Sequence, residues 1–141
     1  MLRRLTVFIC IFLSLMLVTG HAENKFLMHP AELTTMMQEQ PDAIYVDLRS
    51  EKDFNKIHIP GFVNLEYNEE AVRMLSKESR PICLICLSGV RSQKAGILLA
   101  EAGYTDVYVC TFGIADYANL VGEKQMEGAD ICLPCLKLMK E

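Results

Sequence analysis

Short apolar runs alternate with helix-like segments along most of the chain. The runs have the length and composition of buried strands, and they cover residues 43–48, 62–65, 82–86 and 107–110. Between them lie segments with helical spacing of apolar residues, and we predict helices from residue 50, over 69–76, over 91–102 and over 114–120. This order of strand and helix predicts an α/β fold, a parallel β-sheet flanked by helices on both faces.

Individual polar residues and glycines mark where these elements begin and end. Ser50 stands three residues before Asp53, and Asn68 precedes the next helix, so Ser50 and Asn68 are expected to cap helix N-termini. Pro60-Gly61 is a turn signal, and Gly103 is expected to end the helix before it.

The first 22 residues have a pattern of their own. Two arginines lie close to Met1, residues 5–18 form a 14-residue run without a charge, and small residues occupy positions 20 and 22. This is the layout of a secretory signal peptide. An uncleaved membrane anchor is the alternative, but a spanning helix needs about 20 apolar residues. We therefore predict residues 1–22 to be a signal peptide, a periplasmic or secreted mature protein, and no stable membrane association after cleavage.

The remaining chain is predicted to form one domain, residues 23–121, followed by a tail, residues 122–141, which has no strand pattern. Removal of the signal peptide takes away two arginines and changes the formal charge from −4 to −6. An acidic balance without a basic run argues against a nucleic-acid partner.

Five cysteines follow residue 22, and an odd number means that in an oxidising compartment at least one is unpaired or pairs between two molecules. Cys83 and Cys86 lie three apart on a predicted strand, so their side chains should be on opposite faces and too far apart for a disulfide. We expect Cys83 and Cys110 to be core residues. Histidine and cysteine do not cluster within the predicted domain, so we predict no metal site.

The segment from Cys86 to Arg91 is the strongest candidate for chemistry. A cysteine ends a buried strand, a loop with Gly89 follows, and a helix then begins. Open α/β sheets bind ligands at the carboxyl ends of their strands. Loop amides and the positive end of a helix dipole favour a thiolate at such a position. The alternative is a structural cysteine at an ordinary strand–helix turn.

Four segments, in order, resemble the rhodanese family. Residues 46–54 (VDLRSEKDF) resemble an Asp-x-Arg signature with an acidic–aromatic pair, and residues 58–64 (HIPGFVN) resemble a His-Ile-Pro-Gly turn. Residues 86–92 (CLSGVRS) resemble the active-site loop, and residues 98–108 (LLAEAGYTDVY) resemble the helix and strand that follow it. The resemblance implies a rhodanese-like sheet and extends from about residue 26 to residue 117.

The family resemblance implies a sulfurtransferase that needs no cofactor. Cys86 takes a sulfane sulfur from thiosulfate or a persulfide donor, holds it as a persulfide, and passes it to a thiol or cyanide acceptor. Donor and acceptor are small molecules or proteins. By resemblance, the loop that binds the outer sulfur through its amides comprises Leu87, Ser88, Gly89, Val90 and Arg91. The residues that give structural support are Asp47, Arg49 and His58.

Three residues depart from the family pattern. Leu87 and Val90 stand where many thiosulfate-using members have arginine or lysine. Thiosulfate is a dianion, so a loop with few cations favours a persulfide donor over thiosulfate. Phe112 replaces a glycine, and we expect its side chain to narrow the rim of the site.

Other functions remain open at this point. A phosphatase of the same fold has five residues between cysteine and arginine, whereas four separate Cys86 from Arg91. A non-catalytic, partner-binding rhodanese module usually lacks the cysteine. A periplasmic thiol–disulfide or redox protein would use a Cys-x-x-Cys pair.

The tail contains such a pair, Cys132 and Cys135, with Pro134 between them. Two cysteines at this spacing can approach each other in a turn. The pair is either a structural disulfide, a redox pair that receives sulfur from the Cys86 persulfide, or an incomplete metal site.

Overall fold

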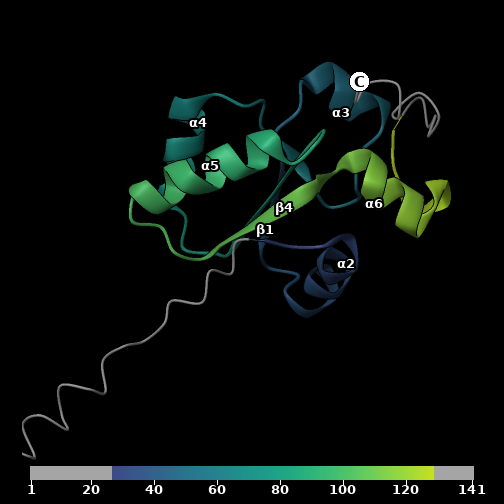
Figure 1. The fold of residues 1–141 in the computed structure, drawn as a ribbon, viewed down its shortest axis with the longest axis horizontal. Coiled ribbons are helices and arrows are strands. Elements are labelled where there is room, and N and C mark those ends of the chain that lie inside the picture. The colour runs from purple at the N-terminus through teal and green to yellow at the C-terminus, as the bar shows by residue number, and fades with distance from the viewer. Residues whose placement is uncertain (1–26, 129–141) are drawn as a thin grey trace, which may run out of the picture.

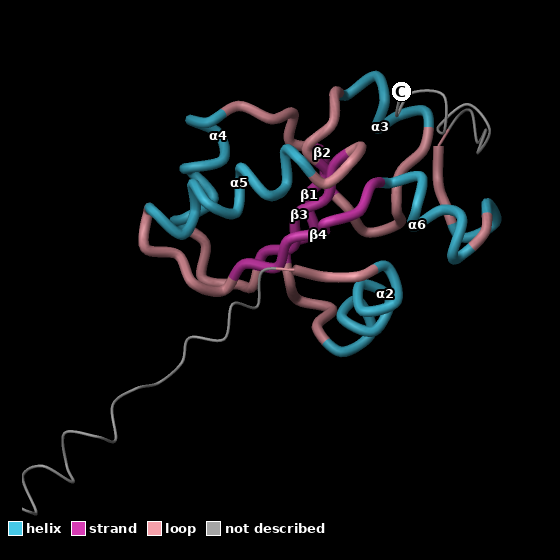
Figure 2. The backbone as a smooth tube through the Cα atoms, viewed as in Figure 1, coloured by secondary structure: helices cyan, strands magenta, loops and turns pink. Residues whose placement is uncertain are grey.

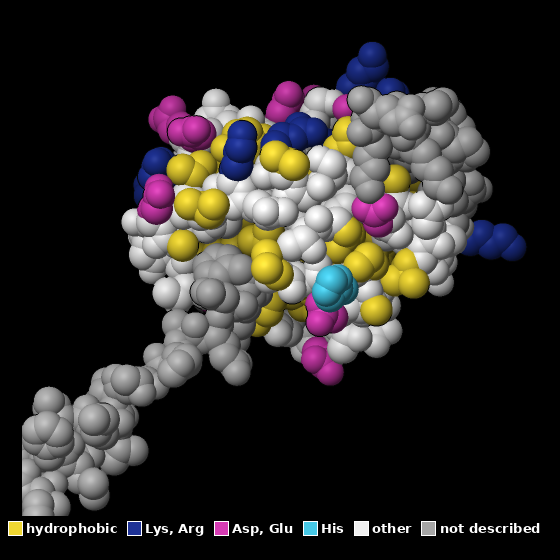
Figure 3. All heavy atoms as spheres, viewed as in Figure 1, with side chains coloured by type: hydrophobic (Ala, Val, Ile, Leu, Met, Phe, Trp, Pro, Cys, Tyr) yellow, Lys and Arg dark blue, Asp and Glu magenta, His cyan; other side chains and the backbone are white. Residues whose placement is uncertain are grey.

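The computed structural model describes residues 27–128. The predicted signal peptide and the Cys132–Cys135 pair lie outside the described residues. Within the described part of the chain, no helix is long and apolar enough to cross a membrane. On the face seen in Figure 3, Lys and Arg side chains are interspersed with acidic and apolar ones.

A four-stranded parallel sheet forms the centre of the molecule (Figures 1 and 2). The strand order is β2-β1-β3-β4, so β1 and β3 are central. The strands are β1 (Ile44–Asp47), β2 (Val63–Asn64), β3 (Ile82–Cys86) and β4 (Val107–Gly113). The predicted α/β class with a parallel sheet is therefore confirmed.

Helices connect the strands and cover both faces of the sheet. They are α2 (Pro30–Glu39), α3 (Glu51–Lys56), α4 (Glu69–Met74), α5 (Val90–Glu101) and α6 (Ile114–Val121), with short 3-10 turns at Leu75–Lys77 and Glu123–Gln125. The predicted caps are present: the Ser50 hydroxyl accepts from the Asp53 amide at 3.2 Å, and the Asn68 side chain accepts from the amide of Glu70 at 2.9 Å.

Alternate residues of the strands enter two separate hydrophobic clusters, one on each face of the sheet. On the side of α4 and α5 the core includes Val46, Leu84, Cys86, Ala95 and Leu99. On the side of α2 and α6 it includes Leu33, Tyr45, Cys83, Ile85 and Ile114. Figure 2 shows these two pairs of helices on opposite sides of the strands.

The packed domain differs from the sequence prediction at two places. β4 runs to Gly113, three residues beyond the predicted end, because a bulge in its pairing with β3 brings Gly113 opposite Cys86. The domain also continues past residue 121. Met126 is buried in the core on the α2 and α6 side, and Glu127 pairs with His58 in an antiparallel bridge.

Candidate active site

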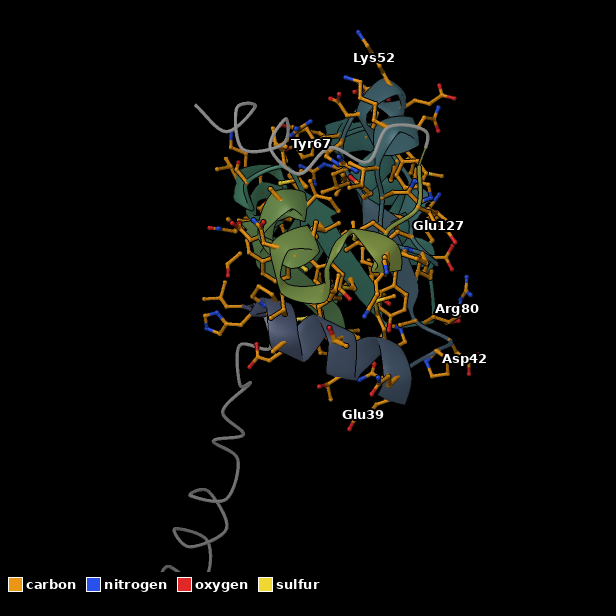
Figure 4. The ribbon with its side chains drawn as sticks, turned by 90° about the vertical axis from the view of Figure 1, so that its right-hand side faces the viewer. Glu39, Asp42, Lys52, Tyr67, Arg80 and Glu127 are labelled. Atoms are coloured by element: carbon orange, nitrogen blue, oxygen red, sulfur yellow. The ribbon has the colours of Figure 1, made fainter. Side chains whose placement is uncertain are left out.

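Cys86 is the last residue of β3 and lies at the carboxyl end of a central strand. Figure 4 distinguishes the two ends of the sheet: Lys52 and Tyr67, which follow β1 and β2, lie at one end, and Asp42 and Arg80, which precede strands, lie toward the other. Only 1% of the surface of Cys86 is exposed. Its thiol is therefore almost completely enclosed by the surrounding protein.

The loop of Leu87, Ser88 and Gly89 joins Cys86 to α5. Within residues 27–128, the amides of Ser88, Gly89 and Val90 donate to no backbone or side-chain acceptor. The first turn of α5 also leaves amides without helical partners, as every helix N-terminus does. The loop consequently offers several hydrogen-bond donors close to the thiol, together with the positive end of the α5 dipole.

Two glycines allow the loop to lie directly against β4. Gly89 has a φ of +84°, in the left-handed region, and a Cβ atom there would collide with the carbonyl of Thr111. A Cβ atom at Gly113 would collide in turn with the carbonyl of Leu87. The loop therefore packs directly against the backbone of β4, and this contact fixes the path of the loop next to Cys86.

This close packing predicts that Gly89→Ala lowers the free energy of unfolding far more than Gly61→Ala does. Both glycines have a φ of +84°, but nothing lies within 4 Å of a Cβ atom at Gly61. Gly61→Ala should cost about 1–2 kcal/mol, the strain of a left-handed L-residue. Gly89→Ala adds the collision with Thr111 and displaces the loop. Urea denaturation of both variants checks this, and equal losses of stability would contradict the packing argument.

Ser92 is a site residue that the sequence analysis did not assign. It is fully buried, and its Oγ lies 3.6 Å from Cys86 Sγ. The hydroxyl is also within hydrogen-bond distance of the carbonyls of Gly89 (2.9 Å) and Cys110 (2.8 Å). Because a hydroxyl has a single proton, it donates to one of these acceptors at a time. A signal was present in the sequence: Ser92 shares the inward stripe of its helix with Ala95 and Leu99.

Arg91 joins the start of α5 to the end of β1. Its Nη1 donates to the carbonyl of Leu48 at 3.3 Å. Among the described residues no carboxylate is within ion-pair distance of Arg91, so its positive charge is uncompensated there. The other loop side chains carry no charge, and Val90 is 55% exposed.

Asp47 and Arg49 form a buried ion pair beside the site. Arg49 is 1% exposed and Asp47 is fully buried, with 2.7 Å between Arg49 Nη2 and Asp47 Oδ2. Arg49 Nη2 also donates to the carbonyl of Ile57 at 2.6 Å. The Asn64 side chain donates to the carbonyls of Asp47 (3.1 Å) and Arg49 (2.9 Å). These bonds join β1, β2 and the segment after α3, and they place no group on the Cys86 sulfur.

His58 lies in the turn after α3. Its Nδ1 is 2.9 Å from the carbonyl of Phe54, and its ring stacks on the Phe54 ring with centroids 4.0 Å apart. Its Nε2 is 3.5 Å from Glu127 Oε2. Among the contacts of the described residues, none joins His58 to Cys86, so the geometry gives His58 no part as a general base for this thiol.

Cys83 and Cys110 belong to the core on the other face of the sheet, as predicted. Their sulfurs are 4.0 Å apart, and both side chains are fully buried and unoxidised. Burial, aided by the contact with Cys83, raises the pKa of the Cys110 thiol well above its usual value. A protonated thiol is a poor nucleophile, so Cys86, which lies at the loop, remains the candidate reactive cysteine among the described ones.

The expectation for Phe112 was wrong. Its side chain does not narrow the rim of the site but is buried on the α2 and α6 side, stacked on Tyr117 with ring centroids 6.4 Å apart. The physical reason is strand alternation, because Phe112 shares a face with Cys110 and not with Cys86.

No group of three or more His, Cys, Asp or Glu side chains within residues 27–128 is arranged to hold a metal ion. The site therefore consists of a single cysteine, the amides of its loop, Ser92, and one nearby cation. This set can carry out nucleophilic chemistry on sulfur without any general base from a side chain.

Comparison with known proteins agrees with this arrangement. The rhodanese-like domain model matches residues 29–120. The thiosulfate sulfurtransferase GlpE of Pseudoalteromonas translucida is 32% identical over 92 residues, which are 64% of this chain and 88% of GlpE. The uncharacterised YibN of Escherichia coli K12 is 35% identical over 89 residues, 60% of this chain and 62% of YibN, so the chain spans less than two thirds of that relative.

Other relatives carry a similar domain within longer proteins. The tRNA uridine(34) hydroxylase of Enterobacter sp. strain 638 is 28% identical over 101 residues, which are 67% of this chain but 29% of the hydroxylase. Among solved structures, the rhodanese-like domain of Alr3790 from Anabaena has a TM-score of 0.57 and 25% identity, covering 72% of this chain and 81% of that domain. Fold, site geometry and sequence together show that the chain belongs to the rhodanese-like domain family.

Proposed function

We propose that this protein is a sulfurtransferase that carries a sulfane sulfur as a persulfide on Cys86. The observation that supports this most directly is the position of the cysteine, at the end of a central strand and under a loop whose amides have no acceptor among the described residues. A persulfide formed there places its outer sulfur about 2 Å beyond Sγ, where loop amides can bind a negatively charged atom.

The proposed reaction has two steps. The Cys86 thiolate attacks the sulfane sulfur of the donor, a new sulfur–sulfur bond forms, and the donor's own bond to that sulfur breaks with its electron pair leaving on sulfite or a thiolate. An acceptor thiolate or cyanide then attacks the outer sulfur and releases the Cys86 thiolate. Covalent catalysis of this kind divides one transfer into two easier ones.

The burial of Cys86, the length of its loop and the presence of the cysteine itself each argue against one of the alternative functions. A protein thiol–disulfide oxidoreductase needs an accessible sulfur, whereas only 1% of Cys86 is exposed. A phosphatase needs a loop large enough for a phosphoryl group, and this loop has four residues between Cys86 and Arg91. A single sulfur atom is small enough for a loop of this length and for a cysteine with so little exposed surface. The cysteine itself distinguishes this chain from a module that only binds partners.

Intact-mass measurement of gently purified protein tests the proposal. We expect a species heavier by one sulfur atom after exposure to a persulfide donor, and its disappearance on treatment with dithiothreitol or cyanide. Proteolysis should place the additional sulfur on the peptide that contains Cys86. A protein that never gains this mass from any sulfane donor would overturn the proposed function.

The electrostatics of the loop favour a persulfide of low charge over thiosulfate as donor. Leu87 and Val90 are apolar, Arg49 is neutralised by Asp47, and Arg91 is the one cation of the loop. We predict that Leu87→Arg lowers the KM for thiosulfate, roughly 5-fold if the added charge contributes about 1 kcal/mol. The gain should shrink at high salt. Leu87→Gln, which adds a polar side chain without charge, is the control, and an equal gain from it would contradict the electrostatic explanation.

A further inference from the structure

Ser92 contacts the sulfur on which the proposed reaction depends. Among the side-chain hydrogen bonds of residues 27–128, the one that reaches Cys86 Sγ comes from Ser92, whose Oγ is 3.6 Å away. Ser92 belongs to the first turn of α5, and both residues are buried. Water therefore has little access to the sulfur, and the Ser92 hydroxyl supplies a polar contact that solvent would supply to an exposed thiol.

The Ser92 hydroxyl has more acceptors around it than it has protons. Besides the sulfur, it lies within hydrogen-bond distance of the carbonyls of Gly89 (2.9 Å) and Cys110 (2.8 Å). A hydroxyl donates a single proton, and rotation about the C–O bond is enough to direct this proton to another acceptor. No heavy atom has to move, so a change of acceptor is compatible with a closely packed site.

The carbonyl of Gly89 does not depend on Ser92 for a hydrogen bond. It also accepts from the amide of Gln93 at 3.1 Å, as expected for the residue that caps the start of α5. When the Ser92 proton turns away, this carbonyl is not left as an unpaired polar group. The proton can therefore leave Gly89 at low cost when a negatively charged acceptor forms beside it.

The charge on Cys86 Sγ changes during the proposed reaction. As a thiolate, Sγ is an ionised acceptor, and hydrogen bonds to ionised groups are about twice as strong as neutral ones. In the persulfide the negative charge lies on the outer sulfur, and Sγ is a neutral, weak acceptor. We therefore expect the Ser92 proton to point to Sγ in the free thiolate and to a carbonyl in the persulfide.

We propose that Ser92 is a catalytic residue that donates a hydrogen bond to Cys86 Sγ when this atom carries the negative charge, an inference that rests on the proposed sulfurtransferase function. In the second step the acceptor thiolate attacks the outer sulfur, the bond between the two sulfurs breaks, and its electron pair goes to Sγ. The Ser92 hydroxyl turns to Sγ as this charge develops and keeps its own proton throughout. A better stabilised thiolate leaves faster, so Ser92 accelerates discharge of the persulfide.

The charged and titratable groups around Cys86 allow its ionisation to be followed. Arg91 on α5 is permanently charged, and Asp47 at the end of β1 is paired with Arg49. On β4, burial raises the pKa of the Cys110 thiol well above its usual value, so this thiol stays neutral near neutral pH. The charged residues of α4, which packs against α5, are exposed to solvent: Glu69, Glu70 and Arg73.

Ser92→Ala tests the inference through the ionisation of Cys86. Loss of one hydrogen bond to a charged group should move the pH midpoint of this ionisation upward by about one unit, a 10-fold change in the equilibrium constant. The ultraviolet absorbance of the thiolate measures the midpoint, after subtraction of the spectrum of Cys86→Ser. Alanine is smaller than serine and favours a helix, and the Gly89 carbonyl retains its bond from Gln93, so the variant is expected to fold.

The rates of the two separate steps give a signature that a purely structural role would not produce. Without the hydrogen bond the thiolate is scarcer but more nucleophilic, with a Brønsted exponent of about 0.4–0.5. Loading of Ser92→Ala by a small persulfide should therefore be about 3-fold slower than wild type below both midpoints and about 3-fold faster above them. Discharge of the loaded variant by cyanide should be about 3-fold slower at every pH.

Two further variants separate the hydroxyl from the packing of α5. Ser92→Thr keeps the hydroxyl and should restore the wild-type pH midpoint. Ala95→Gly is the matched control, because it removes one buried atom from the same face of α5 about one turn further on, and it should leave the midpoint unchanged.

The outcomes distinguish this inference from the proposed function. If Ser92→Ala loads Cys86 with the wild-type midpoint and its pH profile does not cross that of wild type, the role of Ser92 is wrong and the sulfurtransferase proposal stands. An equal loss of rate at every pH in Ser92→Ala and Ala95→Gly would also overturn this role. If neither wild type nor variant takes up sulfur from any sulfane donor, the proposed function itself fails, whatever the midpoints are.

Discussion

We expect Cys86→Ser to abolish the proposed sulfur transfer and to leave the fold intact. Serine keeps the size of the side chain, and Ser92 Oγ, 3.6 Å from the present sulfur, offers the new hydroxyl a hydrogen-bond partner. The hydroxyl is not ionised near neutral pH and forms no persulfide, so turnover should fall to the rate of the uncatalysed reaction. Transfer from a persulfide donor to cyanide measures the loss, and circular dichroism confirms that the variant folds.

Cys83→Ser is the matched control on the same strand. Cys83 faces the opposite side of the sheet, where it contacts Cys110 and apolar side chains. A hydroxyl in this environment should lower the free energy of unfolding by about 1–3 kcal/mol with little change in turnover. Full activity of Cys86→Ser, or selective loss of activity in Cys83→Ser at temperatures where it is folded, would show that the reactive cysteine is assigned incorrectly.

The largest loss of stability is expected from Asp47→Ala. This substitution leaves the guanidinium of Arg49, 1% exposed, without its carboxylate. An unpaired charge in the interior costs about 3–5 kcal/mol, which is a large part of the stability of a small domain. Urea denaturation measures the change. Glu78→Ala breaks the exposed pair between Glu78 and Arg80 and should cost less than about 1 kcal/mol.

A second substitution separates the charge from other effects of Asp47→Ala. In Asp47→Ala/Arg49→Met the unpaired charge is gone, and part of the lost stability should return because an apolar side chain of similar length fills the space. If the double variant is no more stable than Asp47→Ala, the loss comes from packing or from the hydrogen bond that Asp47 accepts from the Arg49 amide, and not from the unpaired buried charge of Arg49.

Local signals in the sequence were sufficient to predict most of the elements and the position of Cys86 at the end of a buried strand. The caps at Ser50 and Asn68 depend on contacts within three residues, and residues 82–86 form a continuous apolar run; both appear in the structure where they were predicted. The opposite orientations of Cys83 and Cys86 follow from strand alternation alone.

The features that were missed depend on contacts between distant parts of the chain. The last three residues of β4 pair with β3 only through a bulge, and Met126 becomes a core residue because the chain returns to His58. Neither leaves a periodic pattern. Ser92 and Phe112 differ in this respect. The helical spacing of Ala95 and Leu99, extended back to Ser92, would have placed Ser92 on the inward face of its helix, beside the site. Strand alternation would have placed Phe112 on the face of Cys110, away from the site.

The mutual packing of Gly89 and Gly113 limits how the site can be altered by protein engineering. A side chain at Gly89 would collide with a main-chain carbonyl of β4, and one at Gly113 would collide with a main-chain carbonyl of the loop. Shortening a neighbouring side chain therefore cannot make room for a larger residue at either position. A library intended to change donor preference should keep both glycines and vary Leu87, Ser88 and Val90. Of these, Ser88 and Val90 are exposed, and new side chains there can project toward the donor without moving the backbone around the sulfur.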